Sequence, residues 1–290
     1  MIKTKNSFKY GGVILDRINS DNALTPKSAK EIELSPTIKK ALANAIKLNF
    51  QTLLQGETGT GKTSAIKYLA FLGQQPFVRI SMSGYTTPDD LIGTKSAKNG
   101  STYYENGILT NAMSIGAILV LDEINITPPD CLAVLHALLD DEKTITLPNG
   151  DILKPHKDFR LFATMNPDYE GTKNLNMAFL NRFEQVINFE TLTPPKETSL
   201  LINNGLDSIN ANNLVMIAVM ARKAYEEGKT MAFLSTRGLL QTAGLIKNGL
   251  TVKSAFEYAV LNKVNKNEQE AFLDFFNAIY KLKSDIVGDK

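Results

Sequence analysis

The sequence predicts an α/β domain, a three-layer fold with a parallel sheet at its centre, followed by a small all-α domain. Short apolar stretches alternate with helical stretches from residue 35 to residue 190. This order of elements builds a parallel sheet covered by helices on both faces. One stretch, residues 117–121, is almost entirely apolar, as expected for a central strand buried on both sides. After Pro194 and Pro195 only helical patterns follow.

Length and composition fit a globular protein and exclude several other classes. The 290 residues suffice for one sizeable domain and a smaller one. The net charge of +2 gives no global field that would recruit nucleic acid or an anionic membrane. No stretch approaches the roughly 18 apolar residues of a spanning helix, and no apolar segment follows Lys3, Lys5 and Lys9 as in a secretory signal. We therefore expect a cytoplasmic protein with no membrane partner.

The N-terminal segment precedes the first strand of the predicted sheet. It contains one strand-like piece at 10–15 and a polar loop over 16–26. A helix is expected from Ser35 and Pro36, because serine caps helices and proline fits their first turn.

A glycine-rich loop joins an apolar strand at 50–55 to a helical pattern at 64–72. It reads G-E-T-G-T-G-K-T and fits the pattern G-x-x-x-x-G-K-[ST] at every defined position. A strand that turns through glycines into a helix points backbone N–H groups and the positive helix end at one spot. Lys62 is expected to reach the β- and γ-phosphates, and the Thr63 hydroxyl to ligate Mg²⁺.

The loop therefore predicts a P-loop nucleoside triphosphatase that binds ATP and Mg²⁺. A glycine-rich turn that binds nothing is the alternative. The expected nucleotide-binding residues are Gly56, Glu57, Thr58, Gly59, Thr60, Gly61, Lys62, Thr63 and Ser64.

Periodicity and turn residues predict the remaining elements. Strands are expected at 77–82, 117–121, 159–164 and 185–189. Helices are expected at 88–92, 109–114 and 128–139. Two hairpins are expected, at 95–104 with Asn99-Gly100 as a type I′ turn, and at 144–153. The C-terminal helical stretches lie near 196–204, 212–227, 236–248, 252–264 and 267–283.

Two acidic residues and an amide follow the strands next to the loop. Asp122 and Glu123 end the most apolar strand, and a metal-dependent phosphoryl transfer needs one acid near the metal and one near the attacking water. We assign Asp122 to Mg²⁺ and Glu123 to the water. Asn166 ends a strand expected between the other two, where its amide would hold the water or contact the γ-phosphate. Polar strand ends without function are the alternative.

Arginine is the preferred partner of phosphate oxygens, and this chain has few. The arginines are Arg17, Arg79, Arg160, Arg182, Arg222 and Arg237. Arg182 is expected at the edge of the α/β domain and Arg237 at a helix start in the second domain, where both could also be ordinary surface residues. Cys131 and the two histidines, His136 and His156, carry no metal-binding pattern and are interpreted as structural.

Taken together, these motifs resemble those of the AAA+ ATPases, and within them the MoxR-like and CbbQ/NorQ-type group. That group is related to the cobalt chelatase ATPase subunit and to McrB-type motors. Residues 56–63 are similar to Walker A, 118–125 to Walker B, 163–169 to the sensor-1 strand and 178–183 to the arginine-finger segment. The resemblance runs from about residue 35 to residue 190, with weaker support in the helical region.

The resemblance implies roles for three residues. Asn166 would be sensor 1, Arg182 the finger that acts on a neighbouring subunit's nucleotide, and Arg237 sensor 2. A finger supplied in trans implies a homo-oligomer, which in this family is usually a hexameric ring.

The resemblance also implies three segments. Residues 1–34 would pack on the ATPase domain, 35–193 would form the AAA+ nucleotide-binding domain, and 194–290 would form the helical lid. Hairpin insertions near 94–105 and 143–153 would face the central pore or a partner.

We therefore expect a ring-forming, ATP-hydrolysing motor that remodels or activates a partner protein, such as a client in cofactor or metal insertion or a von Willebrand factor A-type partner. No partner domain is seen after the lid, so we expect the motor of a multi-component system. A McrB-like motor that acts on nucleic acid through a nuclease is the first alternative, although no basic stripe with interleaved aromatics indicates it. A non-motor ATP switch is the second.

Overall fold

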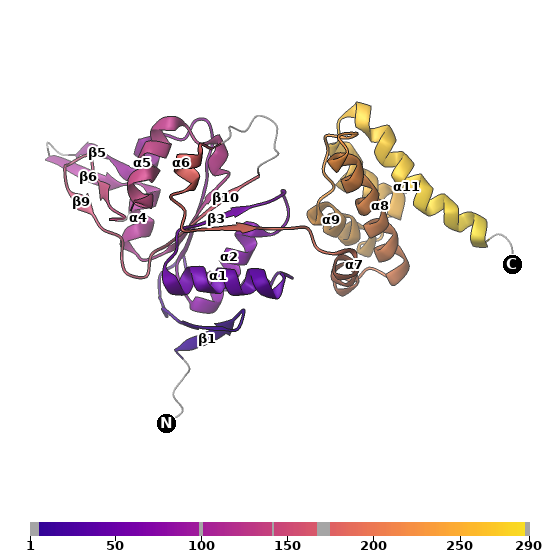
Figure 1. Ribbon diagram of the computed structural model, residues 1–290, viewed down its shortest axis with the longest axis horizontal. Coiled ribbons are helices and arrows are strands. Elements are labelled where there is room, and N and C mark those ends of the chain that lie inside the picture. Colours follow the sequence, from indigo (N-terminus) through magenta and orange to yellow (C-terminus); the bar gives the residue numbers. More distant parts are fainter. Residues whose placement is uncertain (1–5, 99–100, 141, 167–174, 288–290) are drawn as a thin grey trace, which may run out of the picture. The chain divides into compact units, whose positions relative to one another are not determined.

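The computed structural model describes residues 6–98, 101–140, 142–166 and 175–287. The chain forms two compact units (Figure 1). Residues 1–57 and 61–189 make up the first unit, and residues 58–60 and 190–290 make up the second. None of the described helices has both the length and the apolar character needed to cross a bilayer.

A five-stranded parallel sheet lies at the centre of the first unit. Its order is β11 (Gln185–Asn188), β3 (Thr52–Gln55), β10 (Arg160–Met165), β7 (Ile118–Asp122) and β4 (Phe77–Ser81). The predicted position of β10, between the strand before the glycine-rich loop and the strand that ends in Asp122, is confirmed. Since all strands run in the same direction, the residues that follow β3, β7 and β10 meet at one edge of the sheet.

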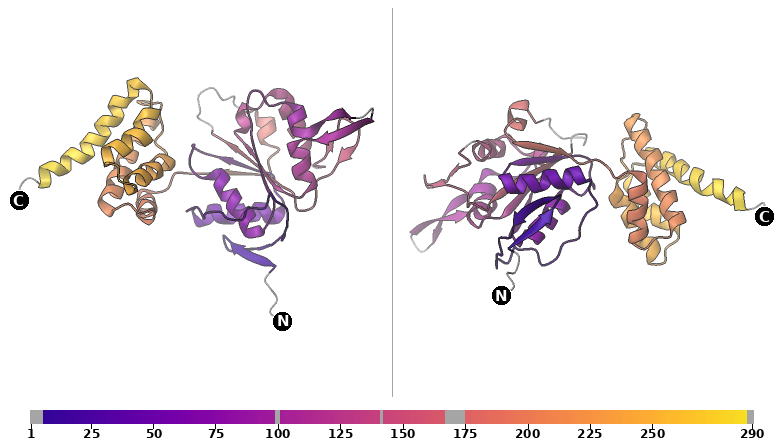
Figure 2. Two further views of the ribbon diagram at one scale, coloured as in Figure 1. Left: turned by 180° about the vertical axis from the view of Figure 1, so that it is seen from behind. Right: turned by 60° about the horizontal axis from the view of Figure 1, so that its bottom comes forward.

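Helices cover both faces of this sheet, so the predicted three-layer α/β fold is confirmed (Figures 1 and 2). One face carries α1 (Pro36–Leu48) and α2 (Lys62–Gly73). The other carries α3 (Pro88–Ile92), α4 (Ile108–Ser114) and α5 (Pro129–Leu139).

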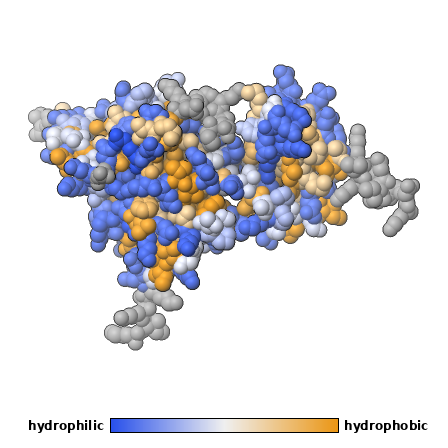
Figure 3. Space-filling view, viewed as in Figure 1, coloured by the Kyte–Doolittle hydropathy of each residue, from blue (hydrophilic) through white to orange (hydrophobic). Residues whose placement is uncertain are grey.

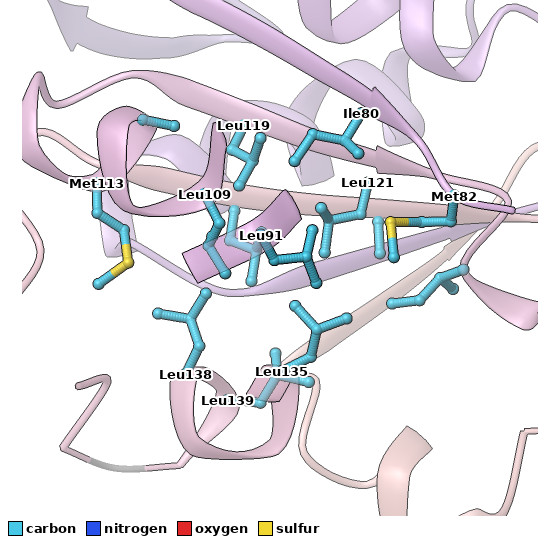
Figure 4. Close-up of a cluster of buried hydrophobic side chains, with 14 of the residues drawn as sticks. Ile80, Met82, Leu91, Leu109, Met113, Leu119, Leu121, Leu135, Leu138 and Leu139 are labelled. Atoms are coloured by element: carbon cyan, nitrogen blue, oxygen red, sulfur yellow. The ribbon is translucent and has the colours of Figure 1, made fainter. Parts of the chain in front are cut away.

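Successive strand residues divide between two apolar cores, because neighbouring side chains of a strand point to opposite faces. Leu53 belongs to the core under α3, α4 and α5, whereas Leu54 belongs to the core under α1 and α2. In Figure 4, Leu119 and Leu121 of β7 lie among leucines of the helices in the core under α3, α4 and α5. Burial on both faces explains why the strand that carries Asp122 is so apolar.

In the described residues, antiparallel hairpins accompany the sheet. They are β1 (Ser7–Tyr10) with β2 (Val13–Asp16), β5 (Gly93–Lys98) with β6 (Ser101–Asn106), and β8 (Ile145–Thr146) with β9 (Ile152–Leu153). The second and third were predicted, and the turn at residues 99–100 lies outside the described part. The first hairpin shows that the prediction of one strand over 10–15 was wrong: Gly11 and Gly12 adopt φ values of +55° and +84° and reverse the chain.

The second unit contains helices around a single apolar core. They are α7 (Pro194–Asn203), α8 (Ser208–Glu226), α9 (Thr236–Lys247), α10 (Val252–Ala259), the 3₁₀ turn η2 (Leu261–Lys263) and α11 (Lys266–Val287). The predicted continuous helix over 252–264 was wrong, because the backbone leaves the helical region at Val260 (φ −125°, ψ −65°).

The face seen in Figure 3 is mostly hydrophilic, with smaller apolar areas between. Large apolar side chains are exposed at separate positions, and Tyr85, between β4 and α3, is 93% exposed. Scattered exposed apolar residues are normal for a protein surface.

Candidate functional site

The glycines at the two ends of the phosphate-binding loop are required by backbone conformation, and the first also by space. Gly56 follows β3 with φ +145°, and a Cβ there would lie 2.2 Å from the carbonyl oxygen of Phe189. Gly61 caps α2 with φ +91°, and a Cβ there would lie 3.0 Å from the side chain of Ile32. Any side chain at either position would be strained. The two glycines therefore let the loop turn tightly at the positive end of α2, a position that favours anions.

Lys62 begins α2 and folds back over this loop. Its Nζ donates hydrogen bonds to the carbonyl oxygens of Gly56 at 2.5 Å and Glu57 at 3.0 Å. The ammonium group thus lies next to the backbone that would surround the phosphates. Phosphate oxygens are charged acceptors, so they would form stronger bonds with this lysine than neutral carbonyls do.

Asp122, at the end of β7, is 4% exposed and accepts hydrogen bonds from hydroxyl groups of two other elements. Its Oδ1 accepts from Thr63 Oγ1 at 2.7 Å and from Thr164 Oγ1 at 2.8 Å. Thr63 belongs to α2 and Thr164 to β10. A hydroxyl and a carboxylate that converge from separate elements form the kind of oxygen set that Mg²⁺ prefers. Thr63 and Asp122 therefore fit the predicted metal site.

The second oxygen of Asp122 is also engaged. Arg79 of β4 forms an ion pair with it through Nε and Oδ2. β4 lies beside β7, with Arg79 opposite Val120, so the guanidinium reaches the carboxylate along the sheet. Sequence reasoning named Arg79 but gave it no role. The available signal was a charged residue in the middle of an otherwise apolar strand.

Glu123 has a left-handed backbone, with φ +58° and ψ +46°, directly after β7. This conformation costs a non-glycine residue about 1–2 kcal/mol, so the surrounding structure must hold it. The N–H group of Glu123 donates to Thr164 Oγ1 at 3.3 Å, while the same hydroxyl donates to Asp122. One threonine, which the sequence did not single out, thus orients both acids.

Asn166 follows β10 at the same edge of the sheet. Its side-chain amide donates to Glu57 Oε2 at 3.5 Å, which joins the strand end to the phosphate-binding loop. Its backbone oxygen accepts from Asn125 Nδ2 at 2.9 Å. Asn125 is 4% exposed and lies in the 3₁₀ turn η1 (Ile124–Ile126), which follows Glu123. Asn125 is a second positioning residue that sequence reasoning missed.

The two candidate arginines belong to other elements than the acids. Arg182, between α6 (Met177–Leu180) and β11, forms an ion pair with Asp140, which follows α5. It is not brought to the acids of its own chain. Arg237 lies in the first turn of α9, within the second unit.

The residues interpreted as structural have structural contacts. Cys131 is fully buried in the core under α3, α4 and α5. The His136 ring contacts Phe179 edge-on, with 4.9 Å between ring centroids. Burial, and secondly the charge of Arg182, lower the pKa of His136, which favours its neutral form.

Two family models match the chain in succession. The model of the AAA domain (dynein-related subfamily) matches residues 51–183, and that of the CbbQ/NirQ/NorQ C-terminal region matches residues 197–278. The first match includes the loop, Asp122, Glu123 and Asn166. The second begins with the helices of the second unit.

Curated relatives support the same grouping. Protein CbbQ of Hydrogenophilus thermoluteolus is 30% identical over 76% of this chain and 82% of its own length. Aerobic cobaltochelatase subunit CobS of a Sinorhizobium species is 25% identical over 81% of this chain and 76% of its own. Midasin of Dictyostelium discoideum is 30% identical over 87% of this chain, but the match spans only 4% of midasin.

The shared hydroxyl of Thr164 can be tested by replacing it with valine. Thr164→Val removes the group that orients both Asp122 and Glu123, so we expect ATP hydrolysis and the affinity for Mg²⁺ to fall by about 10- to 100-fold. Titration of the hydrolysis rate with Mg²⁺ measures both. Thr110→Val is the matched control, since Thr110 is also fully buried and its hydroxyl bonds to the Ile92 carbonyl, away from the acids. Equal losses in both variants would contradict the assigned role.

Arg79 can be tested by Arg79→Gln. The guanidinium occupies one oxygen of Asp122, the carboxylate expected to hold Mg²⁺. Removing the guanidinium should therefore lower the Mg²⁺ concentration needed for half-maximal hydrolysis by a few-fold. Without Mg²⁺ the unfolding free energy should drop by about 1 kcal/mol, a modest value because Arg79 is partly exposed. Denaturant titrations of Arg79→Gln, Asp122→Asn and the double variant give the coupling energy between the two residues. Additive effects would show that the pair contributes nothing.

Proposed function

The chain belongs to the CbbQ/NirQ/NorQ group of AAA+ ATPases, and we propose that it hydrolyses Mg²⁺-ATP in a ring of identical subunits to remodel a partner protein. The observation that carries this proposal is the hydrogen-bond cluster on Asp122, whose Oδ1 accepts from the hydroxyls of Thr63 and Thr164. The Thr164 hydroxyl also accepts from the N–H group of Glu123. Metal, water and phosphate must be held within a few ångström of each other for phosphoryl transfer, and this edge of the sheet gathers groups suited to each.

The chain's own residues divide the work. The backbone of the loop and Lys62 would bind the β- and γ-phosphates. Thr63 with Asp122 would hold Mg²⁺, which when bound supplies charge neutralisation at the phosphates. Glu123 orients the attacking water and accepts its proton. Asn166 positions the same water or the γ-phosphate through its amide. Its hydrogen bond to Glu57 supports this role, because it keeps the amide next to the loop.

Arg182 is proposed to complete the site of a neighbouring subunit. Within its own chain it pairs with Asp140 at the surface, with 36% of its side chain exposed. Such exposed pairs contribute at most about 1 kcal/mol, so the guanidinium can leave Asp140 at little cost. A guanidinium that reaches the terminal phosphate of the next subunit would stabilise the charge of the transition state. Hydrolysis would then require assembly, which we propose to be a hexamer.

The partner is proposed to be a protein. The relative CobS is named a subunit of an aerobic cobaltochelatase, which favours a client in metal or cofactor insertion. A von Willebrand factor A-type partner is also proposed, on the family resemblance of the motifs alone. The net charge of +2 supports a protein partner over nucleic acid, because nucleic-acid binding depends on neutralised phosphates. The second unit is proposed to act as the lid that carries Arg237 as sensor 2.

The shared site can be tested by mixing inactive subunits. Lys62→Ala should abolish ATP binding, and Arg182→Ala should lower hydrolysis by about 10³-fold. In a mixture, some Arg182→Ala subunits have a Lys62→Ala neighbour that still supplies an arginine, so hydrolysis should partly return. Steady-state phosphate release and sedimentation with a non-hydrolysable ATP analogue measure activity and assembly.

A matched mixture provides the control. Lys62→Ala combined with Glu123→Gln should remain inactive, because both substitutions damage the same site and neither subunit can repair the other. If the Arg182→Ala mixture also stays inactive although mixed rings form, or if Arg182→Ala alone keeps the full rate, the proposal of a shared site is wrong.

A further inference from the structure

A buried ion pair joins two helices of the second unit. Glu197 of α7 has no exposed surface, and Arg222 of α8 is 8% exposed. Two parallel hydrogen bonds of 2.8 Å each connect the guanidinium to the carboxylate. The surrounding core is apolar. Burying two charges costs several kcal/mol, so such a pair seldom makes a protein more stable than well-packed apolar residues would.

Two further hydrogen bonds of this pair go to the start of α9. Arg222 Nε donates to the carbonyl oxygen of Leu234 at 2.8 Å. Glu197 Oε1 accepts from the Thr236 hydroxyl at 2.5 Å. Thr236 is the first residue of α9, and Leu234 lies just before its cap, Ser235. The ion pair therefore holds the beginning of this helix on both sides of the cap.

The segment that leads into α9 is fixed by further contacts. The Phe233 ring lies with its centroid 5.7 Å from the guanidinium carbon of Arg222. Glu268 of α11 accepts a hydrogen bond from the N–H group of Ala232 at 3.3 Å. Helices α7, α8 and α11 thus all contact residues 232–236. This start of α9 is held more extensively than a single helix cap requires.

We infer that Glu197 and Arg222 are positioning residues that act through Thr236 on Arg237, the next residue of α9. Directional hydrogen bonds to a helix start fix the direction of its first turn, which apolar packing alone does not do. Arg237 is thereby presented in one orientation for a triphosphate. This inference rests on the proposed role of Arg237 in hydrolysis.

The experiment compares three substitutions on α9 in the full-length, assembled protein. Thr236→Val removes only the hydroxyl that meets Glu197. Thr242→Val is the matched control, because Thr242 is fully buried on the same helix and its hydroxyl bonds to the Gly238 carbonyl at 2.9 Å. Arg237→Ala removes the positioned residue itself. For each protein, kcat and KM for Mg²⁺-ATP are measured together with the thermal unfolding midpoint.

We expect Thr236→Val to change the same kinetic parameter as Arg237→Ala, kcat or KM, by about tenfold, since small misplacements of a group in the site slow the reaction strongly. Thr242→Val should keep wild-type kinetics. A kinetic change in Thr236→Val that merely follows its thermal midpoint, and that Thr242→Val shares, would show a structural role and overturn the inference.

A second variant separates positioning from stability. Glu197→Leu combined with Arg222→Met replaces the ion pair by apolar side chains, which buried pairs often tolerate without loss of stability. We expect this protein to unfold near the wild-type temperature and yet to share the kinetic defect of Arg237→Ala. Wild-type kinetics in both Thr236→Val and this double variant, with a defect in Arg237→Ala, would overturn the positioning role alone. Wild-type kinetics in Arg237→Ala would overturn the proposed role of Arg237 as well.

Discussion

The carboxylate of Asp122 is the constraint on which the first unit depends. It is almost fully buried, and a buried carboxylate must be paired or hydrogen-bonded to be stable. Its partners, Thr63, Thr164 and Arg79, come from a helix and two different strands. The relative positions of α2, β10 and β4 are thus coupled to one charged group. A ligand that moves Asp122 away from any of these partners would therefore shift the positions of α2, β10 and β4.

The order of the strands makes this coupling possible. β7 has β10 on one side and β4 on the other, and β10 in turn pairs with β3, which leads into the phosphate-binding loop. Neighbours in this sheet are far apart in the sequence, so each contact at its edge joins distant segments. The Thr164 hydroxyl of β10 depends on this arrangement. It donates to the Asp122 side chain at the end of β7 and accepts from the backbone N–H group of Glu123, the next residue. The acids are therefore held from the neighbouring strand and not only by their own.

The sequence predicted the features that follow from local residue patterns, but not the contacts between side chains that lie far apart in the chain. The loop and the end of β7 were predictable because glycine spacing and an apolar run before Asp122 are local signals. Of the sheet order, only the position of β10 between β3 and β7 was predicted. Arg79 and Asn125 were missed because their partners lie 43 and 41 residues away. The hairpin at Gly11 and the break at Val260 depend on single backbone angles, which hydrophobic periodicity does not report.

Two arginines of this chain show how burial suits a residue to its task. Arg222 is buried, paired with Glu197 and bonded to Leu234, so it cannot move without exposing an unpaired charge to an apolar core. Such a residue can serve as a fixed support. Arg182 is partly exposed and holds Asp140 at the surface, where water can replace either partner. In the proposed ring, the guanidinium of Arg182 would have to reach a neighbouring subunit in each cycle. A weak surface pair leaves it that freedom, whereas a strong pair would not.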